Sequence, residues 1–245
     1  MKSEYKAKIK IFRRIIIHIG KKAAAEEALR YIDESKIIGL GTGSTVNKFL
    51  NIIHKNFVKN DINIKAVSTS SQTTNLATSL GIEILDFNSV GEIEILIDGA
   101  DEVDPYKNLI KGGGGALLME KIVANFSKNL IIIADETKLV DTLGNFPLPV
   151  EIARFGSDKT ANHICHLLND LKYSGFEIIL RRDKKNNYLT DESNFILDLY
   201  LNQIKDAYSL SRELLMIPGV IEVGLFLDMA SKIIVGRDDK RVDIF

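Results

Sequence analysis

The sequence is short of cysteine and of net charge, and it has no long hydrophobic run. The single cysteine, Cys165, excludes an internal disulfide and a thiolate metal cluster, and it is typical of a reducing compartment such as the cytoplasm. With 32 basic and 33 acidic residues, no overall positive field attracts nucleic acid or a membrane surface. No apolar run approaches the roughly 20 residues that span a bilayer. We therefore expect a cytoplasmic protein without nucleic-acid or membrane partners.

Residues 9–19 are basic and apolar, a combination found in signal peptides. Arg13, Arg14 and His18 interrupt the apolar run, however, and no small-residue cleavage site follows. We therefore predict that this stretch is not an export signal. The remaining interpretations are an extra turn or strand, or a start codon assigned too far upstream, ahead of a domain that begins near Lys21.

The overall composition, with 45% hydrophobic and 27% charged residues, is that of a soluble globular protein. In the first part of the chain, hydrophobic periodicity predicts helices alternating with strands. The expected helices cover residues 21–33, 46–57, 71–80 and 116–127, and the expected strands cover 37–40, 64–67, 82–87, 93–97 and 130–134. Continuous apolar strands that alternate with helices are typical of a parallel sheet covered on both faces. Such sheets bind ligands at the carboxyl ends of their strands.

Two prolines, Pro147 and Pro149, mark an expected crossing into a second domain. The patterns beyond them predict a strand at 150–155, a helix at 157–172, strands at 176–182 and 195–200, a helix at 206–216 and a strand after Gly219. This βαββαβ order is typical of a ferredoxin-like unit. The last strands, 222–227 and 232–235, are expected to return to the first domain. The predicted fold is α/β, with a parallel-sheet domain over residues 1–145 and 218–245 and a smaller ferredoxin-like α+β domain over residues 146–217.

A glycine-rich loop with the sequence GTGST occupies residues 41–45, between an expected strand and an expected helix. Two glycines allow a tight turn, and hydroxyl groups at a helix N-terminus favour an anion such as phosphate. Glycines at such a turn can also serve geometry alone. A dinucleotide fingerprint would need a third glycine where the chain has Val46, and the G-x-x-x-x-G-K-[ST] loop is absent. Both nucleotide interpretations are therefore disfavoured.

Up to four carboxylates, in the sequence DGADEVD at residues 98–104, follow the expected strand 93–97. They could form a solvated acidic turn, or a magnesium site, since hard cations prefer oxygen ligands. We disfavour the metal because Lys111 and Lys138 are expected at the same edge of the sheet, where they could neutralise the acids. His163 and His166 share a helix face near Cys165 but have no further ligand nearby in the sequence, so no metal site is expected there.

Lys111 precedes four consecutive glycines, Gly112 to Gly115, and an expected helix. These glycines could form a flexible hinge, but their amides could also form an anion-binding nest beside a lysine. Glu120 lies on the following helix, and its neighbours three and four residues away are all apolar: Ala116, Leu117, Val123 and Ala124. Partial desolvation would raise the pKa of Glu120 and make it a better general base near neutral pH. The alternative is a glutamate at the helix border, paired with a lysine.

Four motifs in series, GTGST at 41–45, DGADE at 98–102, KGGGGALLMEK at 111–121 and ADETK at 134–138, resemble the A-type ribose-5-phosphate isomerases. The later segments FPLPVE, TDESNFILD and PGVIEVGLF resemble that family as well, so the resemblance extends from about Lys21 to about Gly236. It implies interconversion of ribose 5-phosphate and ribulose 5-phosphate in the pentose phosphate pathway, through a cis-enediolate and without metal or cofactor. It also implies a Rossmann-like parallel-sheet catalytic domain with a smaller ferredoxin-like α+β lid domain, assembled as a homodimer or homotetramer. The first twenty residues and the pair Glu136 and Thr137 depart from the family pattern.

The resemblance assigns roles residue by residue. Glu120 would carry the proton between C2 and C1, and Asp98, Asp101 and Lys111 would assist ring opening and stabilise the enediolate oxygens. Substrate contacts are expected from Thr42, Gly43, Ser44, Thr45, Asp98, Gly99, Ala100, Asp101, Lys111, Gly112, Gly113, Gly114 and Lys138, and Lys21 is a further candidate for the phosphate.

Two other hypotheses compete with the isomerase. A phosphosugar-sensing binding module would keep the glycine loop but have no use for Glu120 and the aspartates. A nucleotide-dependent dehydrogenase would be stabilised against heat by NAD or NADP.

Overall fold

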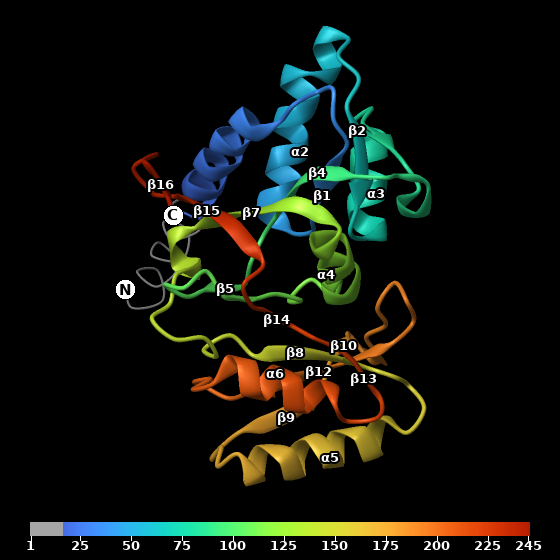
Figure 1. Ribbon diagram of the computed structural model, residues 1–245, viewed down its shortest axis with the longest axis vertical. Helices are drawn as coiled ribbons and strands as arrows, with labels where there is room; N and C mark the ends of the chain where they lie inside the picture. The colour runs from blue at the N-terminus through green and yellow to red at the C-terminus, as the bar shows by residue number, and fades with distance from the viewer. Residues whose placement is uncertain (1–16) are drawn as a thin grey trace, which may run out of the picture.

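The computed structural model describes residues 17–245. Figure 1 shows two units: an upper one built on a large sheet, in which the described residues both begin and end, and a lower one built on a smaller sheet. The chain passes into the lower unit at β8 and returns through β14. The expectations for residues 9–16 fall outside the described residues.

The large sheet has seven strands in the order β16-β15-β7-β4-β1-β2-β3. Neighbours pair in parallel, except that the edge strand β16 is antiparallel to β15. The parallel sheet predicted from the apolar runs is therefore confirmed. Its strands are β1 (Ile38–Leu40), β2 (Lys65–Ser68), β3 (Glu83–Ile84), β4 (Ile93–Asp98), β7 (Ser127–Asp135), β15 (Ala230–Gly236) and β16 (Val242–Ile244).

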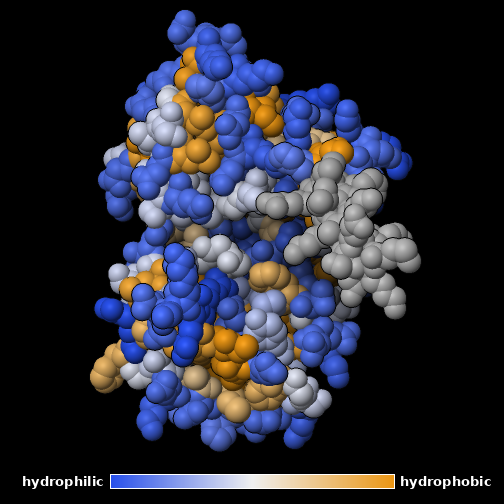
Figure 2. All heavy atoms as spheres, turned by 180° about the vertical axis from the view of Figure 1, so that it is seen from behind, coloured by the Kyte–Doolittle hydropathy of each residue, from blue (hydrophilic) through white to orange (hydrophobic). Residues whose placement is uncertain are grey.

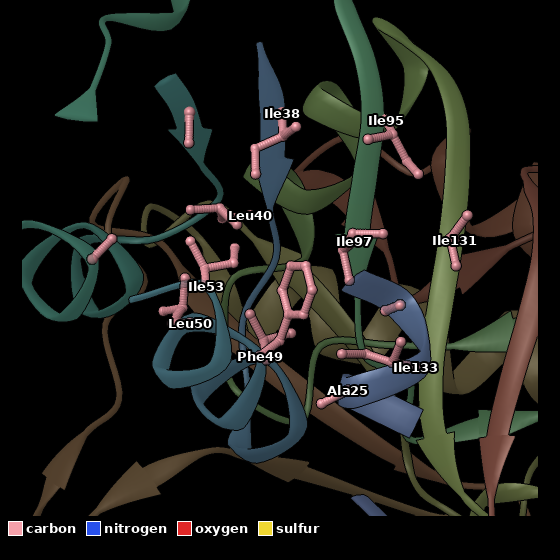
Figure 3. Packing of buried hydrophobic residues seen from close by; sticks show 14 of the residues in the cluster. Ala25, Ile38, Leu40, Phe49, Leu50, Ile53, Ile95, Ile97, Ile131 and Ile133 are labelled. Carbon is pink, nitrogen blue, oxygen red and sulfur yellow. The ribbon is translucent and has the colours of Figure 1, made fainter. Parts of the chain in front are cut away.

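Helices cover both faces of the large sheet. Successive residues of a strand point to opposite faces, so each strand contributes side chains to two hydrophobic clusters. In β4, Ile95 and Ile97 pack into one hydrophobic cluster, whereas Leu96 packs into another. The first cluster also holds the helix over residues 17–28, α2 (Ser44–Asn56) and α3 (Ser71–Ser79), and Figure 3 shows Phe49, Leu50 and Ile53 of α2 among its side chains. The second cluster holds α4 (Leu117–Asn125).

The helix boundaries differ from the predicted ones by one or two residues at most ends and by more at the first helix. The first described helix covers residues 17–28 and ends in a short 3-10 turn, Leu29–Tyr31, whereas the expected helix began at Lys21. Gly20 belongs to the packed fold, since a β-carbon there would lie 2.5 Å from the carbonyl oxygen of Gly236. The helix expected at 116–127 ends at Asn125, and Ser127 already begins β7.

The lower unit contains a four-stranded antiparallel sheet in the order β13-β8-β12-β9. Helices α5 (Ser157–Asp170) and α6 (Ala207–Leu215) cover one face and pack against Leu148, Val150 and Ile152 of β8. The βαββαβ order and this strand arrangement are ferredoxin-like, as predicted. Its strands are β8 (Leu148–Ile152), β9 (Glu177–Leu180), β12 (Phe195–Tyr200) and β13 (Val220–Val223).

Pro149 lies inside β8, which begins at Leu148, two residues before the strand start expected at Val150. The carbonyl of Pro149 accepts a hydrogen bond from the Gly224 amide (2.8 Å), beyond the end of β13. Main-chain nitrogen and oxygen of one strand residue face the same side, so the proline nitrogen also faces Gly224. The Gly224 carbonyl accepts from the Lys111 amide instead (2.9 Å), so the missing N–H of the proline leaves it with a donor.

The expected domain boundary at residue 218 and the expected strand 222–227 were both misplaced. Because β13 pairs with β8, the chain leaves the smaller sheet only after Val223, and residues 225–226 form a separate strand. That strand, β14 (Leu225–Phe226), pairs with β6 (Leu109–Ile110), which pairs with β5 (Glu102–Val103). Val223 and Phe226 are buried in different clusters, so the crossing between the units falls between them. The division into two domains otherwise stays a prediction.

The three-stranded sheet β14-β6-β5 and the hairpin of β10 (Arg182–Asp183) and β11 (Asn186–Asn187) were not predicted. Strands of two residues are too short for an alternating pattern to reveal them. On the surface seen from behind, hydrophobic residues occur in small groups among hydrophilic ones over both units (Figure 2). None of the helices described within residues 17–245 is long and apolar enough to cross a membrane.

Candidate active site

A pocket opens at the carboxyl ends of β1 and β4, where the Rossmann-like topology predicts a ligand. Most of the residues predicted for the site line it, together with Lys21. The lining residues are Lys21, Thr42, Gly43, Ser44, Thr45, Gly99, Ala100, Asp101, Lys111, Gly114, Glu120 and Lys138. Three predicted residues, Asp98, Gly112 and Gly113, do not line the pocket and contact residues that do.

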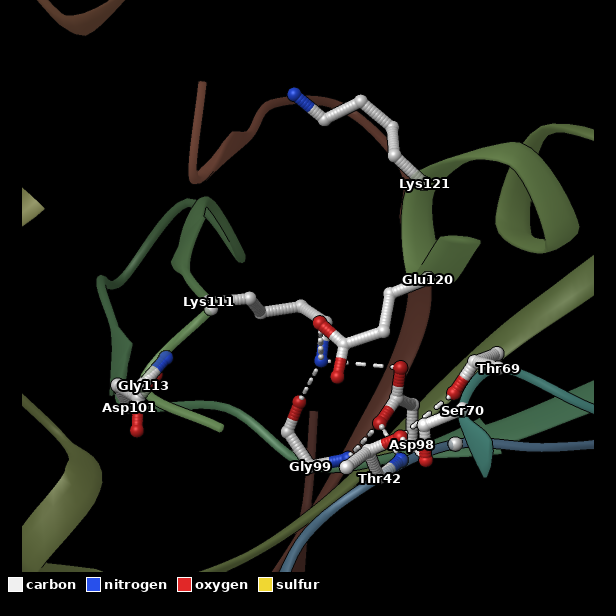
Figure 4. A network of polar contacts seen from close by, with 12 residues as sticks. Thr42, Thr69, Ser70, Asp98, Gly99, Asp101, Lys111, Gly113, Glu120 and Lys121 are labelled. Atoms are coloured by element: carbon white, nitrogen blue, oxygen red, sulfur yellow. Dashed lines mark hydrogen bonds and ion pairs between the residues drawn. The ribbon is translucent and has the colours of Figure 1, made fainter. Parts of the chain in front are cut away.

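A buried lysine joins two carboxylates at the inner end of the pocket (Figure 4). The Lys111 ammonium lies 3.0 Å from Asp98 Oδ2 and 3.2 Å from Glu120 Oε2, and it donates a hydrogen bond to the Gly99 carbonyl (2.5 Å). The exposed fractions of Asp98, Lys111 and Glu120 are 0%, 2% and 3%. Glu120 is therefore paired with a lysine, but inside the protein rather than at a helix border.

Burial and the neighbouring opposite charge shift the pKa values of Glu120 and Lys111 in opposite directions. Burial raises the pKa of Glu120 to about 8, against the opposing charge of Lys111 and with some help from Asp98. Burial alone would lower the pKa of Lys111, but the charges of Asp98 and Glu120 outweigh it and raise that pKa above its usual value. Lys111 therefore stays an ammonium, while Glu120 can exchange a proton near neutral pH.

Asp98 ties the glycine loop to this cluster. Its Oδ1 accepts hydrogen bonds from the amides of Thr42 (3.0 Å) and Gly99 (2.7 Å). A β-carbon at Gly41 would collide with the Asp98 carboxylate, so only glycine allows the loop to pass this close. The same carboxyl group thus holds Lys111 with one oxygen and the loop with the other.

A group of hydroxyl side chains holds Thr42 from the opposite side, and sequence reasoning missed it. The Thr42 hydroxyl lies 2.9 Å from that of Thr69 and 2.8 Å from that of Ser70, and Thr73 donates to the Gly41 carbonyl (2.8 Å). The sequence showed these residues only as a Ser/Thr-rich helix start. They are brought to the loop because β2 lies beside β1 in the sheet.

The outer end of the pocket is formed by the N-terminus of α2. Gly43 precedes the helix with φ +120°, a conformation that favours glycine, and no side chain caps the helix. The first amides of a helix have no partner within it, so they are free to bind an anion. There is also no acidic residue in the first turn to oppose one.

Two lysines stand beside this helix end. Lys21 donates a hydrogen bond to the Ser44 hydroxyl (2.8 Å) and lies 3.9 Å from Asp135, and Lys138 lines the same pocket. Burial lowers the pKa of Lys21, the charge of Asp135 opposes this, and the positive charge of Lys138 lowers it further. An anion bound here would relieve the repulsion between the two ammonium groups.

Only two of the four acidic side chains at 98–104 belong to the site. Asp101 lines the pocket and accepts a hydrogen bond from the Gly113 amide (2.7 Å). Glu102 instead accepts from the amides of Gly144 (2.7 Å) and Phe146 (2.5 Å), and Asp104 accepts from the Asn108 amide (2.8 Å) within its own turn. Asp101 precedes β5, whereas Glu102 is the first residue of β5 and binds amides of the segment 144–146, away from the pocket.

No group of three or more His, Cys, Asp or Glu side chains within residues 17–245 is arranged to hold a metal ion. His163 and His166 lie on α5 in the lower unit, on a helix whose buried residues are Thr160, Ile164 and Leu168. These two histidines are not part of the pocket.

The lower unit contacts the upper one at several points, and sequence reasoning missed two that lie next to the pocket segments. Asp191 accepts hydrogen bonds from the amide (2.7 Å) and the hydroxyl (2.8 Å) of Ser71, at the start of α3. Thr190 and Asn194 on either side of Asp191 donate to the fully buried Glu151 of β8 (2.9 and 3.0 Å). The second place is the glycine segment after Lys111, which Arg181 and Tyr188 contact.

The family described as ribose 5-phosphate isomerase A (phosphoriboisomerase A) matches residues 65–240 of this chain. A ribose-5-phosphate isomerase A of Dinoroseobacter shibae is 42% identical over 225 residues, which are 92% of this chain and 86% of that protein. The chain belongs to the ribose 5-phosphate isomerase A family. The resemblance carried by the four motifs is thereby confirmed.

Further members of the isomerase A family extend the match. The protein of that name from Maricaulis maris is 44% identical over 220 residues, or 89% of this chain and 94% of its own. A ribose 5-phosphate isomerase structure from Plasmodium falciparum has a TM-score of 0.87 at 33% identity and covers 94% of this chain and 98% of its own. A D-ribose-5-phosphate isomerase structure in complex with phospho-erythronic acid has a TM-score of 0.83 at 38% identity. The match covers 92% of this chain and 96% of that one.

Proposed function

We propose that this chain interconverts D-ribose 5-phosphate and D-ribulose 5-phosphate, with Glu120 as the base. The observation that carries the proposal is the buried Glu120 carboxylate, 3.2 Å from the Lys111 ammonium, in a pocket whose other end is a free helix N-terminus. An aldose-ketose isomerisation needs a base beside two adjacent carbons, a positive group for the developing oxyanion and a remote handle. The pocket contains one group of each kind.

The proton balance of the reaction needs only one base. Glu120 takes the proton from C2 of the open-chain aldose, the electron pair forms the C1–C2 double bond, and the aldehyde oxygen becomes the anionic oxygen of a cis-enediolate. Glu120 then returns the proton to C1, while the C2 hydroxyl loses its proton to the enediolate oxygen and becomes the ketone. Lys111 stabilises the negative oxygen because it stays charged throughout.

Asp98 and Asp101 have supporting roles in this proposal. Asp98 keeps Lys111 and the Thr42 amide in place, and Asp101 lines the pocket, where it can assist proton transfer during ring opening. The phosphate binds at the other end, to the amides of the helix that begins at Ser44 and to Lys21 and Lys138. Binding energy from this non-reacting group orients the sugar over Glu120.

The first test is a coupled assay of the purified chain on ribose 5-phosphate, with and without EDTA. We expect formation of ribulose 5-phosphate at the same rate in both, because Lys111 supplies the positive charge that a metal would otherwise bring. Loss of activity with EDTA would overturn the metal-free scheme. Binding of ribose 5-phosphate without turnover would instead identify a sensing module.

We also propose a homodimer or homotetramer that acts in the cytoplasm. The assembly is supported by the family resemblance, and the cytoplasmic location by the single cysteine. Sedimentation equilibrium at several protein concentrations would measure the mass of the assembly. A monomer of 27.3 kDa at micromolar concentration would contradict the proposed assembly.

A further inference from the structure

Three successive carbonyl oxygens of the glycine segment beside the pocket are held by side chains of the lower unit. Arg181 Nη1 donates a hydrogen bond to the carbonyl of Gly112 (2.7 Å) and a longer one to that of Gly113 (3.3 Å). The Tyr188 hydroxyl donates to the carbonyl of Gly114 (3.2 Å). These contacts join segments about 70 residues apart in the sequence.

Arg181 is itself fixed by Asp198 of β12. Nε of the guanidinium donates to Asp198 Oδ2 (2.9 Å) and Nη2 donates to Oδ1, so the pair is bidentate. The two side chains are only 13% and 12% exposed. Leu197 and Leu199 pack into the core of the lower unit, so the alternation of the strand turns Asp198 to the opposite face, toward the glycine segment. A planar guanidinium held in this way has little freedom to turn away.

Fixing the carbonyls also fixes the amides. Residues 17–245 contain no cis peptide bonds, and in a trans peptide the N–H points opposite to the C=O. The amides of Gly113 and Gly114 therefore point away from Arg181. The Gly113 amide donates to Asp101 (2.7 Å), but the Gly114 amide has no hydrogen-bond partner within residues 17–245. Gly114 lines the pocket with Lys111 and Glu120, so its amide is a free donor beside the proposed reaction.

We propose that Arg181 is a positioning residue for the reaction, which holds the Gly114 amide as a second donor, after Lys111, to the negative oxygen of the enediolate. This inference rests on the proposed function. Arg181 does not line the pocket, and its guanidinium is occupied by Asp198 and the glycine carbonyls, so it acts through the peptide groups. Asp198 and Tyr188 support the same arrangement from either side.

The test replaces Arg181 by lysine, with Arg182→Lys as the matched control. Arg182 is exposed and adjacent, so the control makes the same chemical change without touching the glycine segment. Lysine keeps the positive charge but has no planar fork to hold Asp198 and two carbonyls together. We expect kcat of Arg181→Lys to fall about tenfold, since losing one oxyanion donor outright costs roughly a hundredfold or more and here the donor is only displaced.

Two ligands separate this role from a purely structural one. Phospho-erythronic acid carries a carboxylate at the end remote from its phosphate. In Arg181→Lys its affinity should fall about tenfold, as kcat does. The affinity for inorganic phosphate, the KM for ribose 5-phosphate and the melting temperature should stay near those of Arg182→Lys. If both ligands are weakened together and the melting temperature falls, Arg181 serves the fold alone and the inference is wrong.

A second variant covers the case in which Arg181→Lys does not fold. Tyr188→Phe keeps the ring and removes only the hydrogen bond to the Gly114 carbonyl, and it should lower kcat about threefold with unchanged phosphate binding. Wild-type kcat in both variants would overturn the inference while the proposed function stands. A wild-type protein without turnover would overturn the proposed function itself.

Discussion

The inner and outer ends of the pocket differ in burial and in how their charges are balanced. At the inner end, Asp98, Lys111 and Glu120 are at most 3% exposed and pair with one another within the protein. At the outer end, Ser44 is exposed, and Lys21 and Lys138 lie half-buried beside free helix amides. The inner end is complete without a ligand, whereas the outer end has an excess of positive groups.

This difference indicates what each end can do. Charges out of water interact strongly and shift one another's pKa values, which suits an inner end that moves a proton. Charges near water are screened and exchange ligands readily, which suits an outer end that binds and releases a solvated phosphate. Substitutions at the inner end should therefore change kcat, and those at the outer end KM. The following experiments test this division, beginning with the largest expected effect.

Glu120→Gln should lower kcat by roughly a hundredfold or more, because the amide cannot accept the C2 proton. Binding of ribose 5-phosphate should survive, since the outer end is untouched. Steady-state kinetics and calorimetric titration would measure the two quantities. Glu34→Gln, on an exposed residue, is the matched control. Nearly wild-type turnover in Glu120→Gln would remove Glu120 from the mechanism.

Activity should depend on pH through Glu120. With its pKa raised to about 8 by burial, the base is mostly protonated in the free enzyme at pH 6.5. We expect kcat/KM to rise about tenfold per pH unit up to that value and then to level off. The substrate phosphate loses its second proton near pH 6, so measurements from pH 6.5 upward isolate the protein group. A flat profile between pH 6.5 and 9 would contradict this assignment.

The same shift has a consequence for stability. The pKa of Glu120 is higher in the folded protein than its ordinary value of 4.5, so between pH 4.5 and about 8 the folded state holds a proton that the unfolded state has lost. The contribution of Glu120 to stability therefore falls as the pH rises through this window. Chemical denaturation should show that Glu120→Gln loses less stability than the wild type between pH 5 and 8. An equal loss in both would argue against a raised pKa.

Lys138→Met should raise the KM for ribose 5-phosphate about tenfold and change kcat less than threefold, because it removes one charge that binds the phosphate in both ground and transition states. The KM should also rise with salt, more steeply in the wild type than in the variant. Lys159→Met, on an exposed residue of α5, is the control. A large fall in kcat at constant KM would place Lys138 with the inner end instead.

Ser44→Ala should have the smallest effect, about a two- to threefold rise in KM at constant kcat. It removes the hydroxyl that accepts a hydrogen bond from Lys21, while the helix amides that bind the phosphate remain. Ser79→Ala, at the exposed end of α3, serves as the control. A rise in KM of a hundredfold would show that the hydroxyl, rather than the amides, dominates phosphate binding.

The inner and outer ends were not equally visible in the sequence. The glycine loop of the outer end could be recognised from the sequence, because its glycines, its hydroxyl residues and the helix they precede are adjacent in the chain. Glu120 was also recognisable, since four apolar neighbours on its helix indicated burial before any tertiary contact was known. The carboxylates at 98–104 were harder to interpret. Glu102 and Asp104 are carboxylates in the same short segment as Asp98 and Asp101, but they bind backbone amides away from the pocket.

The sequence by itself determined the α/β architecture and most of the residues that line the pocket, because hydrophobic periods and glycine-rich turns are local properties. Only the tertiary structure decided which charges meet and which face of the glycine segment turns to the pocket. Lys111 reaches Asp98 and Glu120 because short strands that leave no sequence pattern bring β6 beside the end of β4. Arg181 reaches Gly112 across 69 residues because the lower sheet folds back onto the upper unit. Such contacts depend on how the two units pack, and nothing in either segment alone encodes them.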